Sequence, residues 1–216
     1  MTRNQINRVL CFGLVTSAAI IAGCGQSQSY ESQYYVLEAA RDREPALARI
    51  DAALAVHRFS VDAAFAGRNL VYRRSEFRYE TDYYHEFLIA PGTMIAERTR
   101  DWLADSGLFS RVLPASAGVK PTYTLEGSVT ALYCDFTNES APVAVVEIRF
   151  FLLGGPGADE RVVFTQTYRA VSPVQDRTAK EFVAALNRSL VDILTRLEMD
   201  LGKVLAERSS QNTPPT

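Results

Sequence analysis

Three stretches in the second half of the chain alternate apolar with polar residues, and this pattern constrains the fold more than any other feature. An extended chain directs successive side chains to opposite faces, so residues 123–133, 143–153 and 162–170 are each predicted to form a strand with one buried face. Gly154-Gly155-Pro156-Gly157 separates the last two stretches and predicts an antiparallel hairpin. The residues expected to point inward on the first two strands are Tyr123, Leu125, Gly127, Val129, Ala131 and Tyr133, and Ala144, Val146, Ile148, Phe150 and Leu152.

Two segments carry helical periodicity. Pro91 is suited to the first position of a helix, where a missing N–H is not needed, and Ser106-Gly107 is a suitable end. Thr178 with Glu181 three residues later predicts a capping box at the start of a longer helix. The expected apolar stripes are Met94, Ile95, Trp102 and Leu103 on the first helix, and Phe182, Leu186, Leu190, Ile193, Leu197, Leu201 and Val204 on the second.

The first half of the chain is less regular. Residues 34–37 predict a strand, and residues 62–67 predict a loop. Residues 49–61 fit a helical face or an alternating strand, and their β-branched and aromatic residues favour the strand. Strands and helices segregated in this way predict an α+β fold, a single domain whose mostly antiparallel sheet carries two main helices on one face.

The N-terminus has the form of a secretory signal. Arg3 and Arg8 precede an apolar run over residues 9–22, which is too short to be interpreted first as a membrane span. Ile21-Ala22-Gly23-Cys24 follows and resembles the lipobox of bacterial lipoproteins. In that class the peptide is cut before the cysteine, whose thiol receives fatty acyl chains such as palmitate. Position, flanks and spacing favour this over an ordinary signal with an incidental cysteine.

These features divide the chain into a signal peptide over 1–23, a lipidated N-terminus and tether over 24–33, an α+β domain over 34–206 and a disordered tail over 207–216. Removal of the signal leaves a net charge of −4, which gives no electrostatic basis for binding nucleic acid. Of the three cysteines only Cys134 then remains, so no intrachain disulfide is expected. Gly25 and Gln26 follow Cys24 where an inner-membrane retention signal would have Asp. We therefore expect outer-membrane anchoring that faces the periplasm.

Residues that could support catalysis are few. The two histidines, His57 and His85, lack the spacing of metal ligands, and the glycines at 154–157 lack the Lys-Ser/Thr of a phosphate loop. No Gly-x-Ser-x-Gly motif is present, and Cys134 has no basic neighbour in sequence that would lower its pKa. We expect no cofactor, no metal site and no enzymatic activity, which disfavours a periplasmic hydrolase.

An aromatic and charged run over residues 69–87 is the candidate contact surface. Extended backbone would place Phe77, Tyr79, Thr81, Tyr83, His85 and Phe87 on one face. Tyrosines provide contact area together with a polar tip, so the run is suited to bind a partner or a lipid headgroup. The alternative is cross-strand aromatic packing over a helix, and the sequence leaves both interpretations open. The candidate residues are Tyr72, Tyr79, Tyr83, Tyr84 and Phe87.

A series of short motifs, listed below in chain order, resembles the ABC-type transport auxiliary lipoprotein family, relatives of the paraquat-inducible protein C lipoproteins. The resemblance extends from about residue 34 to 205, and the order and spacing of the motifs matter more than any one of them. Many relatives have Trp at the position of Phe87, so no role of that indole carries over. The motifs are Tyr34-Tyr35-Val36-Leu37, Leu70-Val71-Tyr72-Arg73, Asp82-Tyr83-Tyr84-His85-Glu86-Phe87, Trp102-Leu103-Ala104-Asp105-Ser106-Gly107-Leu108-Phe109, Leu125-Glu126-Gly127 and Leu132-Tyr133-Cys134-Asp135-Phe136.

The resemblance implies a non-catalytic subunit that works beside an ATPase, a permease and a mammalian-cell-entry-type protein in moving lipid between membranes. It leaves room for a homo-oligomer such as a ring, and only Cys24 maps onto a functional position. The alternative function is an outer-membrane biogenesis or secretion accessory lipoprotein that acts as a scaffold or plug.

Overall fold

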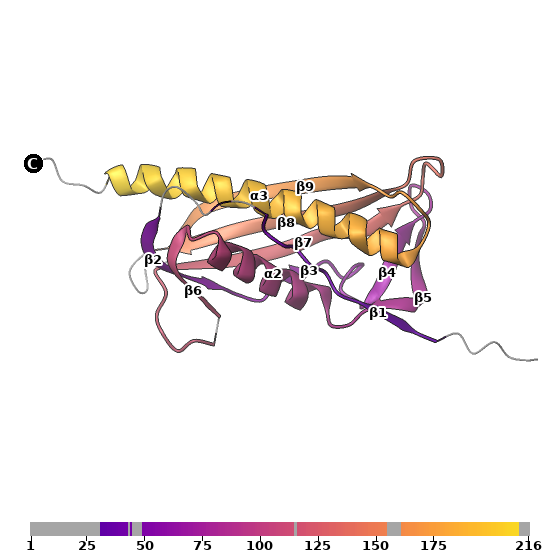
Figure 1. Cartoon of the computed structure of the whole chain (residues 1–216), viewed down its shortest axis with the longest axis horizontal. Helices are drawn as coiled ribbons and strands as arrows, with labels where there is room; N and C mark the ends of the chain where they lie inside the picture. Colours follow the sequence, from indigo (N-terminus) through magenta and orange to yellow (C-terminus); the bar gives the residue numbers. More distant parts are fainter. Residues whose placement is uncertain (1–30, 43, 45–48, 115, 155–160, 212–216) are drawn as a thin grey trace, which may run out of the picture. The chain divides into compact units, whose positions relative to one another are not determined.

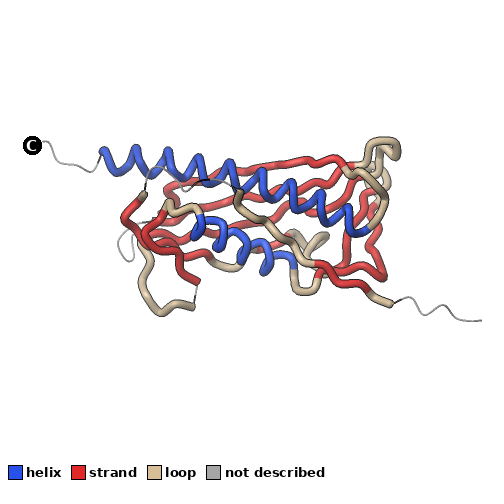
Figure 2. Tube along the Cα trace, viewed as in Figure 1, coloured by secondary structure: helices blue, strands red, loops and turns tan. Residues whose placement is uncertain are grey.

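The computed structural model describes residues 31–211 apart from 43, 45–48, 115 and 155–160, and residues from Ser32 onward form one compact unit. The signal segment, Cys24 and most of the glycine-rich loop at 154–157 lie outside the described residues. Two helices, α2(Pro91–Asp105) and α3(Ala179–Gln211), lie on one face of a sheet, as Figures 1 and 2 show. The α+β prediction is confirmed. The strands are β1(Gln33–Tyr35), β2(Ile50–Val56), β3(Ser60–Val61), β4(Asn69–Arg73), β5(Tyr79–Phe87), β6(Phe109–Pro114), β7(Tyr123–Asp135), β8(Val143–Gly154) and β9(Arg161–Pro173).

Strand β7 organises the sheet. One of its edges pairs with β8, which pairs in turn with β9, and these two long ladders are antiparallel. The other edge is shared along its length by β2, β3 and β4, all parallel to β7. Beyond them the order continues to β6 on one side and to β5 and β1 on the other. The sheet is therefore mixed, because parallel neighbours such as β2 and β6 are joined by a long crossover that contains α2.

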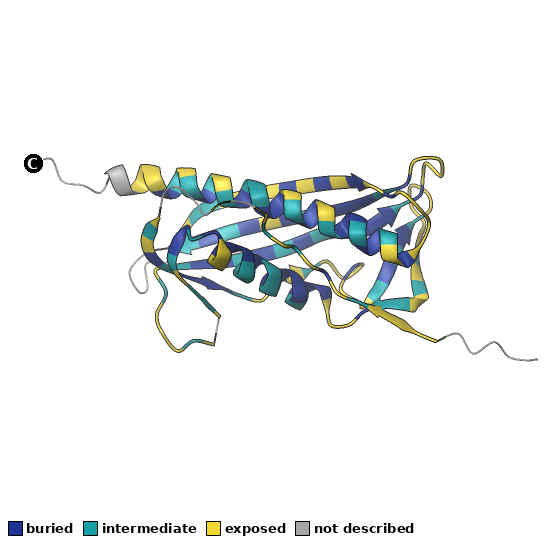
Figure 3. Cartoon of the chain, viewed as in Figure 1, coloured by how far each residue is buried: buried dark blue, intermediate teal, exposed yellow. Residues whose placement is uncertain are grey.

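The core lies between the sheet and α3. The five inward residues predicted for β8 are all at most 1% exposed, and the predicted stripe of α3 covers them, as the buried face of the helix in Figure 3 shows. One stripe position differs from the prediction: Val204 is half-buried, whereas Leu205, one turn after Leu201, is 1% exposed. A fully buried side chain of this kind contributes about 1.5–3 kcal/mol by leaving water.

A bulge in β7 reverses its faces. Val129 pairs with Ile148 and Ala131 pairs with Glu147, which leaves Thr130 as an extra residue. An inserted residue of this kind shifts every following side chain to the other face. The predicted alternation is thus correct up to Val129. Ala131 and Tyr133 are still buried, at 5% and 6% exposed, but they lie on the opposite face of the sheet from the one predicted. Leu132 and Cys134 face the core instead, opposite Val146 and Ala144.

The helix ends match their sequence signals in part. Gly107 follows α2 with φ of 67°, a conformation that suits glycine. At the start of α3, the Thr178 hydroxyl accepts the backbone N–H of Glu181 at 3.2 Å. The reciprocal half of the capping box is missing, because the Thr178 N–H donates to Oδ1 of Asp176 at 2.9 Å. Helix α3 continues to Gln211, five residues past the domain boundary expected at 206, and residues 212–216 lie outside the described residues.

Candidate interaction surface at the hairpin of β4 and β5

The five predicted contact residues lie on one hairpin and differ widely in exposure. Strands β4 and β5 pair antiparallel, with Tyr72 opposite Glu80. Tyr72 is 7% exposed and Phe87 is 2% exposed, so both belong to the core. Tyr79 is half-exposed, whereas Tyr83 is 83% exposed and Tyr84 is 42% exposed. The packing interpretation therefore describes Tyr72 and Phe87, and Tyr83 and Tyr84 are the residues that remain available for contact.

Tyr72 packs beneath the start of α3. Its ring centroid lies 5.3 Å from that of Phe182 and 5.9 Å from that of Phe136, both edge to face. The guanidinium of Arg74 lies 5.4 Å from the Tyr72 ring centroid and 4.9 Å from that of Phe136. Aromatic pairs in this geometry add stability beyond the area they bury. Tyr72 thus fastens the hairpin to the helical layer.

Asp82 distorts β5 at its middle. Its Oδ1 accepts the backbone N–H groups of Tyr84 at 2.9 Å and His85 at 3.0 Å, as in an Asx turn. Its Oδ2 accepts the Tyr72 hydroxyl at 2.7 Å and lies 2.9 Å from Nδ1 of His85. The register of the hairpin shifts across this region, so the single aromatic face predicted for residues 77–87 is wrong. The shift turns Tyr83 outward.

The same contacts set the charge state of the carboxyl group. Burial acts to raise the pKa of Asp82, but the hydrogen bonds from Tyr72 and from the backbone at Tyr84, together with His85, outweigh it and hold the pKa below its ordinary value. Burial and the bond to Asp82 raise the pKa of Tyr72. Asp82 is therefore an ionised carboxylate at neutral pH whose acceptor positions are occupied by the hairpin itself.

A groove of about 350 Å³ lies beside this network. Arg74 and Arg177 line it, and each is matched by a carboxylate: Arg74 lies 2.7 Å from Glu80, and Arg177 lies 3.6 Å from Glu139. The groove therefore combines an aromatic floor with a rim of balanced charge. Its lining residues are Tyr72, Arg74, Asp82, His85, Phe136, Arg177, Ala179 and Phe182.

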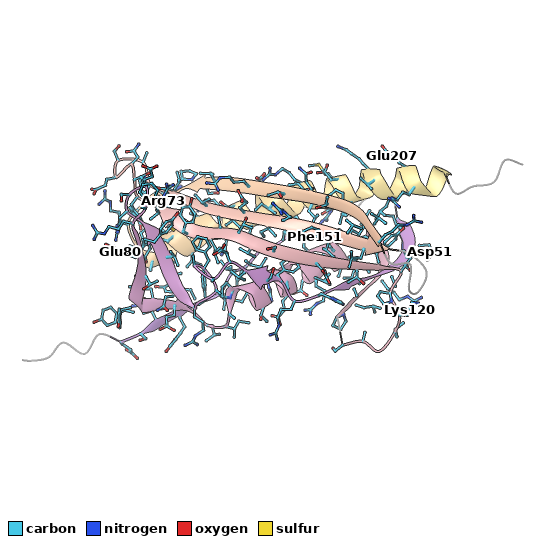
Figure 4. The ribbon with its side chains drawn as sticks, turned by 180° about the vertical axis from the view of Figure 1, so that it is seen from behind. Asp51, Arg73, Glu80, Lys120, Phe151 and Glu207 are labelled. Carbon is cyan, nitrogen blue, oxygen red and sulfur yellow. The ribbon has the colours of Figure 1, made fainter. Side chains whose placement is uncertain are left out.

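A second aromatic cluster covers the opposite face of the sheet. Tyr133, turned outward by the β7 bulge, stacks on Phe65 at 5.7 Å and meets Tyr79 at 5.6 Å between ring centroids. Arg73, labelled in Figure 4, lies 6.0 Å from the Tyr79 ring centroid and 3.2 Å from Asp135. Tyr79 thus packs against this outer cluster. Sequence reasoning missed it because alternation alone places Tyr133 on the inner face.

The remaining candidates for chemistry are buried or isolated. Burial raises the pKa of the Cys134 thiol to about 12, which makes it a poor nucleophile at neutral pH. His57 lies 3.5 Å from Glu126 on the surface. Among the described residues, no group of three or more His, Cys, Asp or Glu side chains is placed to hold a metal ion. Over the same residues, neither helix combines the length and apolar character needed to cross a bilayer.

The chain matches a known family in sequence and solved structures in fold. A family model described as "ABC-type transport auxiliary lipoprotein component" matches residues 35–197. A crystal structure of a Xanthomonas campestris protein of the family DUF330 is similar with a TM-score of 0.67 at 20% identity, over 85% of this chain and 99% of the other. A second crystal structure, of an uncharacterised protein, gives a TM-score of 0.62 at 16% identity, over 79% and 99%. At these identities the two structures support the fold alone. No curated protein matches the chain.

Proposed function

Because the chain belongs to the family of ABC-type transport auxiliary lipoprotein components, we propose that it is a non-catalytic, lipid-anchored periplasmic subunit of an envelope lipid transport system. Acylated Cys24 holds the domain at the outer membrane. The domain docks the periplasmic end of a transporter built from a permease, an ATPase and a mammalian-cell-entry-domain protein. The family match over residues 35–197 is the observation that carries this proposal.

Two features of the fold support a docking role. The polar network of the hairpin is used internally, since Asp82 accepts hydrogen bonds from Tyr72 and from two backbone groups that hold the bulge of β5. The same bulge presents Tyr83 and Tyr84 to solvent on a strand that is paired with β4 and β1. The polar groups of this hairpin form hydrogen bonds within the domain, and its aromatic side chains are exposed. Such a surface is suited to binding a partner rather than to catalysis.

Tethering explains how such a subunit would contribute without an energy source. A domain held at a membrane has its docking surface confined near that membrane, which raises the effective concentration for any partner that arrives there. Two or more acyl chains provide stable anchoring, since each buried methylene contributes about 0.8 kcal/mol. Energy for transport would come from the ATPase.

The test is purification of the tagged full-length chain from its own host after gentle cross-linking, with the partners identified by mass spectrometry. We expect an ABC permease, its ATPase and a mammalian-cell-entry-domain protein. We also expect the chain in the outer-membrane fraction of a sucrose gradient. The matched control is Cys24→Ala, which should accumulate as uncleaved or unanchored precursor and lose these partners.

Three results would contradict the proposal. Correct membrane sorting of Cys24→Ala would contradict lipid anchoring through Cys24. Recovery of the parent chain in the inner-membrane fraction would contradict its placement at the outer membrane. Recovery of an outer-membrane barrel protein without an ATPase or permease would favour the biogenesis or secretion accessory instead.

A further inference from the structure

Five exposed apolar and aromatic side chains gather on β1, on β5 and in the turn that follows β5. Each is between 40% and 83% exposed, and together we call them the β1–β5 patch. The most exposed member is Tyr83, where the Asx turn of Asp82 turns the strand outward. The patch consists of Tyr34, Tyr83, Tyr84, Leu88 and Ile89.

The strand register brings these residues together. β1 runs parallel to β5 with Tyr34 opposite Glu86, and the N–H of Leu88 donates to the carbonyl of Tyr35 at 2.8 Å. Tyr84, two residues before Glu86 on β5, lies on the same face as Glu86 and hence beside Tyr34. The rings of Tyr83 and Tyr84 lie 6.4 Å apart between centroids. Tyr34, Tyr83 and Tyr84 therefore lie close together, and the exposed Leu88 and Ile89 follow directly in the turn after β5.

Arg68 contacts this patch and pairs with the acidic residue beside it, Glu86. Its guanidinium lies 5.9 Å from the Tyr34 ring centroid, within range of a cation–π contact. One guanidinium nitrogen lies 2.9 Å from Glu86, and the other donates to the carbonyl of Leu88 at 3.3 Å. The charges of Arg68 and Glu86 are thus paired with each other. Contact through the patch would depend on apolar and aromatic area rather than on net charge.

The patch adjoins the point where the chain enters the domain. β1 begins at Gln33, which pairs with His85 of β5 and lies only nine positions after Cys24. Nine residues span at most about 30 Å when fully extended, and a flexible coil of that length averages roughly 17 Å. A chain acylated at Cys24 therefore keeps β1 and β5 within that distance of the bilayer.

We propose that the β1–β5 patch lies directly against the phospholipid surface and orients the anchored domain. This inference rests on the lipid anchor of the proposed function. Tyrosine rings are enriched at the membrane–water interface, where their apolar body and polar hydroxyl are both accommodated. Leu88 and Ile89 would enter the acyl boundary beside them. The opposite end of the sheet, where Figure 4 labels Asp51 and Lys120, then points away from the membrane toward the transporter.

The test uses the lipidated full chain in vesicles of phosphatidylethanolamine and phosphatidylglycerol. An environment-sensitive dye is attached at Tyr83→Cys or, as the matched control, at Lys120→Cys. The native Cys134 is buried and does not compete. Flotation with the vesicles is measured first, and quenching of the dye by lipids with nitroxide headgroups is measured second.

We expect both labelled chains to float, with nitroxide lipid reducing the fluorescence at position 83 roughly twofold and leaving position 120 unchanged. High salt should not alter the quenching, because the charges of Arg68 and Glu86 are paired. Adding Tyr34→Ser and Leu88→Ser should restore most of the fluorescence at 83 without changing flotation or the melting temperature.

The outcomes separate the two proposals. Chains that fail to float overturn the lipid anchor and the contact that depends on it. Chains that float with equal or no quenching at both positions overturn the patch contact alone. A dye at 83 that is shielded from nitroxide lipid by a second copy of the chain assigns the patch to an interface between copies, which also overturns the membrane contact.

Discussion

Arg41 and Glu198 form a two-point ion pair across 157 residues of sequence. Nε and one terminal nitrogen of Arg41 lie 3.0 and 2.8 Å from the two carboxylate oxygens of Glu198. The same carboxylate accepts the indole N–H of Trp102 at 2.8 Å. The Arg41 and Glu198 side chains are 5% and 12% exposed, so this is a buried arrangement. One carboxylate on α3 thereby connects α2 with the segment that joins β1 to β2.

That segment is held at further points along its length. The N–H of Glu38 donates to Oδ1 of Asn187 on α3 at 3.0 Å, and Leu37 is 3% exposed. Figure 1 shows the chain passing over the helical layer between β1 and β2. The position of β1, and with it the β1–β5 patch, therefore depends on contacts with both helices.

Glu198→Leu should be strongly destabilising. It leaves the Arg41 charge buried without its carboxylate and the Trp102 N–H without an acceptor, a change that costs about 3–5 kcal/mol in other buried pairs. Denaturant unfolding measures the loss. Adding Arg41→Met should recover part of it, because the charge that has lost its buried carboxylate is removed. Arg98→Ala, which breaks an exposed pair with Asp101, is the control and should cost less than about 0.5 kcal/mol. A loss equally small for Glu198→Leu would contradict this role.

The sequence predicted regular segments well where one face of a strand or helix is buried along its whole length. Every predicted inward position of β8 is buried, because that strand pairs over consecutive residues on both edges and has no extra residue of its own. Alternation failed at β7 and β5, where the extra residue at Thr130 and the Asx turn of Asp82 each shift the register. A single residue decides such a shift, and its effect depends on partners far away in sequence.

The order of the strands in the sheet could not be predicted from local sequence patterns. Nothing in residues 50–61 indicates that β2 and β3 run parallel to β7, because that pairing is set by the crossover through α2. For the same reason, the sequence identified only part of the candidate site. Composition identified the aromatic run, but only the packing of Phe182 and Phe136 on Tyr72 separates its buried members from its exposed ones.

Asp82→Asn should reduce stability in a pH-dependent way. The pKa of Asp82 is lowered in the folded state, so its ionised form stabilises the fold above the ordinary carboxyl pKa, and this contribution is lost as pH falls through the folded value. We expect the variant to be about 1–2 kcal/mol less stable at pH 7. The difference in unfolding free energy between the variant and the parent should become smaller below about pH 4. Chemical denaturation across pH measures it, with Asp51→Asn at an exposed position of β2 as the control. A gap that is constant with pH would contradict the assignment.

The exposed and buried members of the aromatic run should respond differently to truncation. Phe87→Ala opens a cavity at a 2% exposed position and should cost about 3–5 kcal/mol. Tyr83→Ala removes a side chain that is 83% exposed and should change stability by less than about 0.5 kcal/mol. Thermal or urea unfolding of both variants measures the two stability losses. Comparable losses would mean that Tyr83 packs against the domain in solution.

Two helical glycines should respond to alanine with opposite signs. In α3, a Cβ at Gly202 meets only Cδ1 of Leu108 at 3.7 Å, so Gly202→Ala should stabilise by about 0.5–1 kcal/mol. In α2, a Cβ at Gly92 would lie 2.7 Å from the backbone oxygen of Phe59, which cannot move without disturbing the approach to β3. Gly92→Ala should therefore destabilise by about 1–3 kcal/mol despite its better helix propensity. Urea unfolding of each single variant reports the sign, and stabilisation at both positions would contradict the close approach at Phe59.

Strand β9 has a long edge with no strand beside it among the described residues, and α3 covers that edge with arginines. Arg188, Arg196 and Arg208 donate to the backbone carbonyls of Pro173, Arg169 and Val163 at 2.7, 2.9 and 3.3 Å, respectively. Backbone groups left open on an edge can pair with another chain. The three side chains occupy acceptors that a second strand would otherwise use.

Replacing these three arginines with alanine should therefore promote association through β9. Light scattering during size-exclusion chromatography should show larger species at concentrations where the parent is unchanged, and backbone amide exchange along β9 should slow in those species. Arg98→Ala combined with Lys180→Ala and Lys203→Ala removes three charges from the helices without opening the edge and controls for the change in net charge. If that control associates to the same extent, loss of charge rather than an uncovered edge is responsible. If the triple variant stays unchanged in size, the twist and side chains of β9 protect the edge without the arginines.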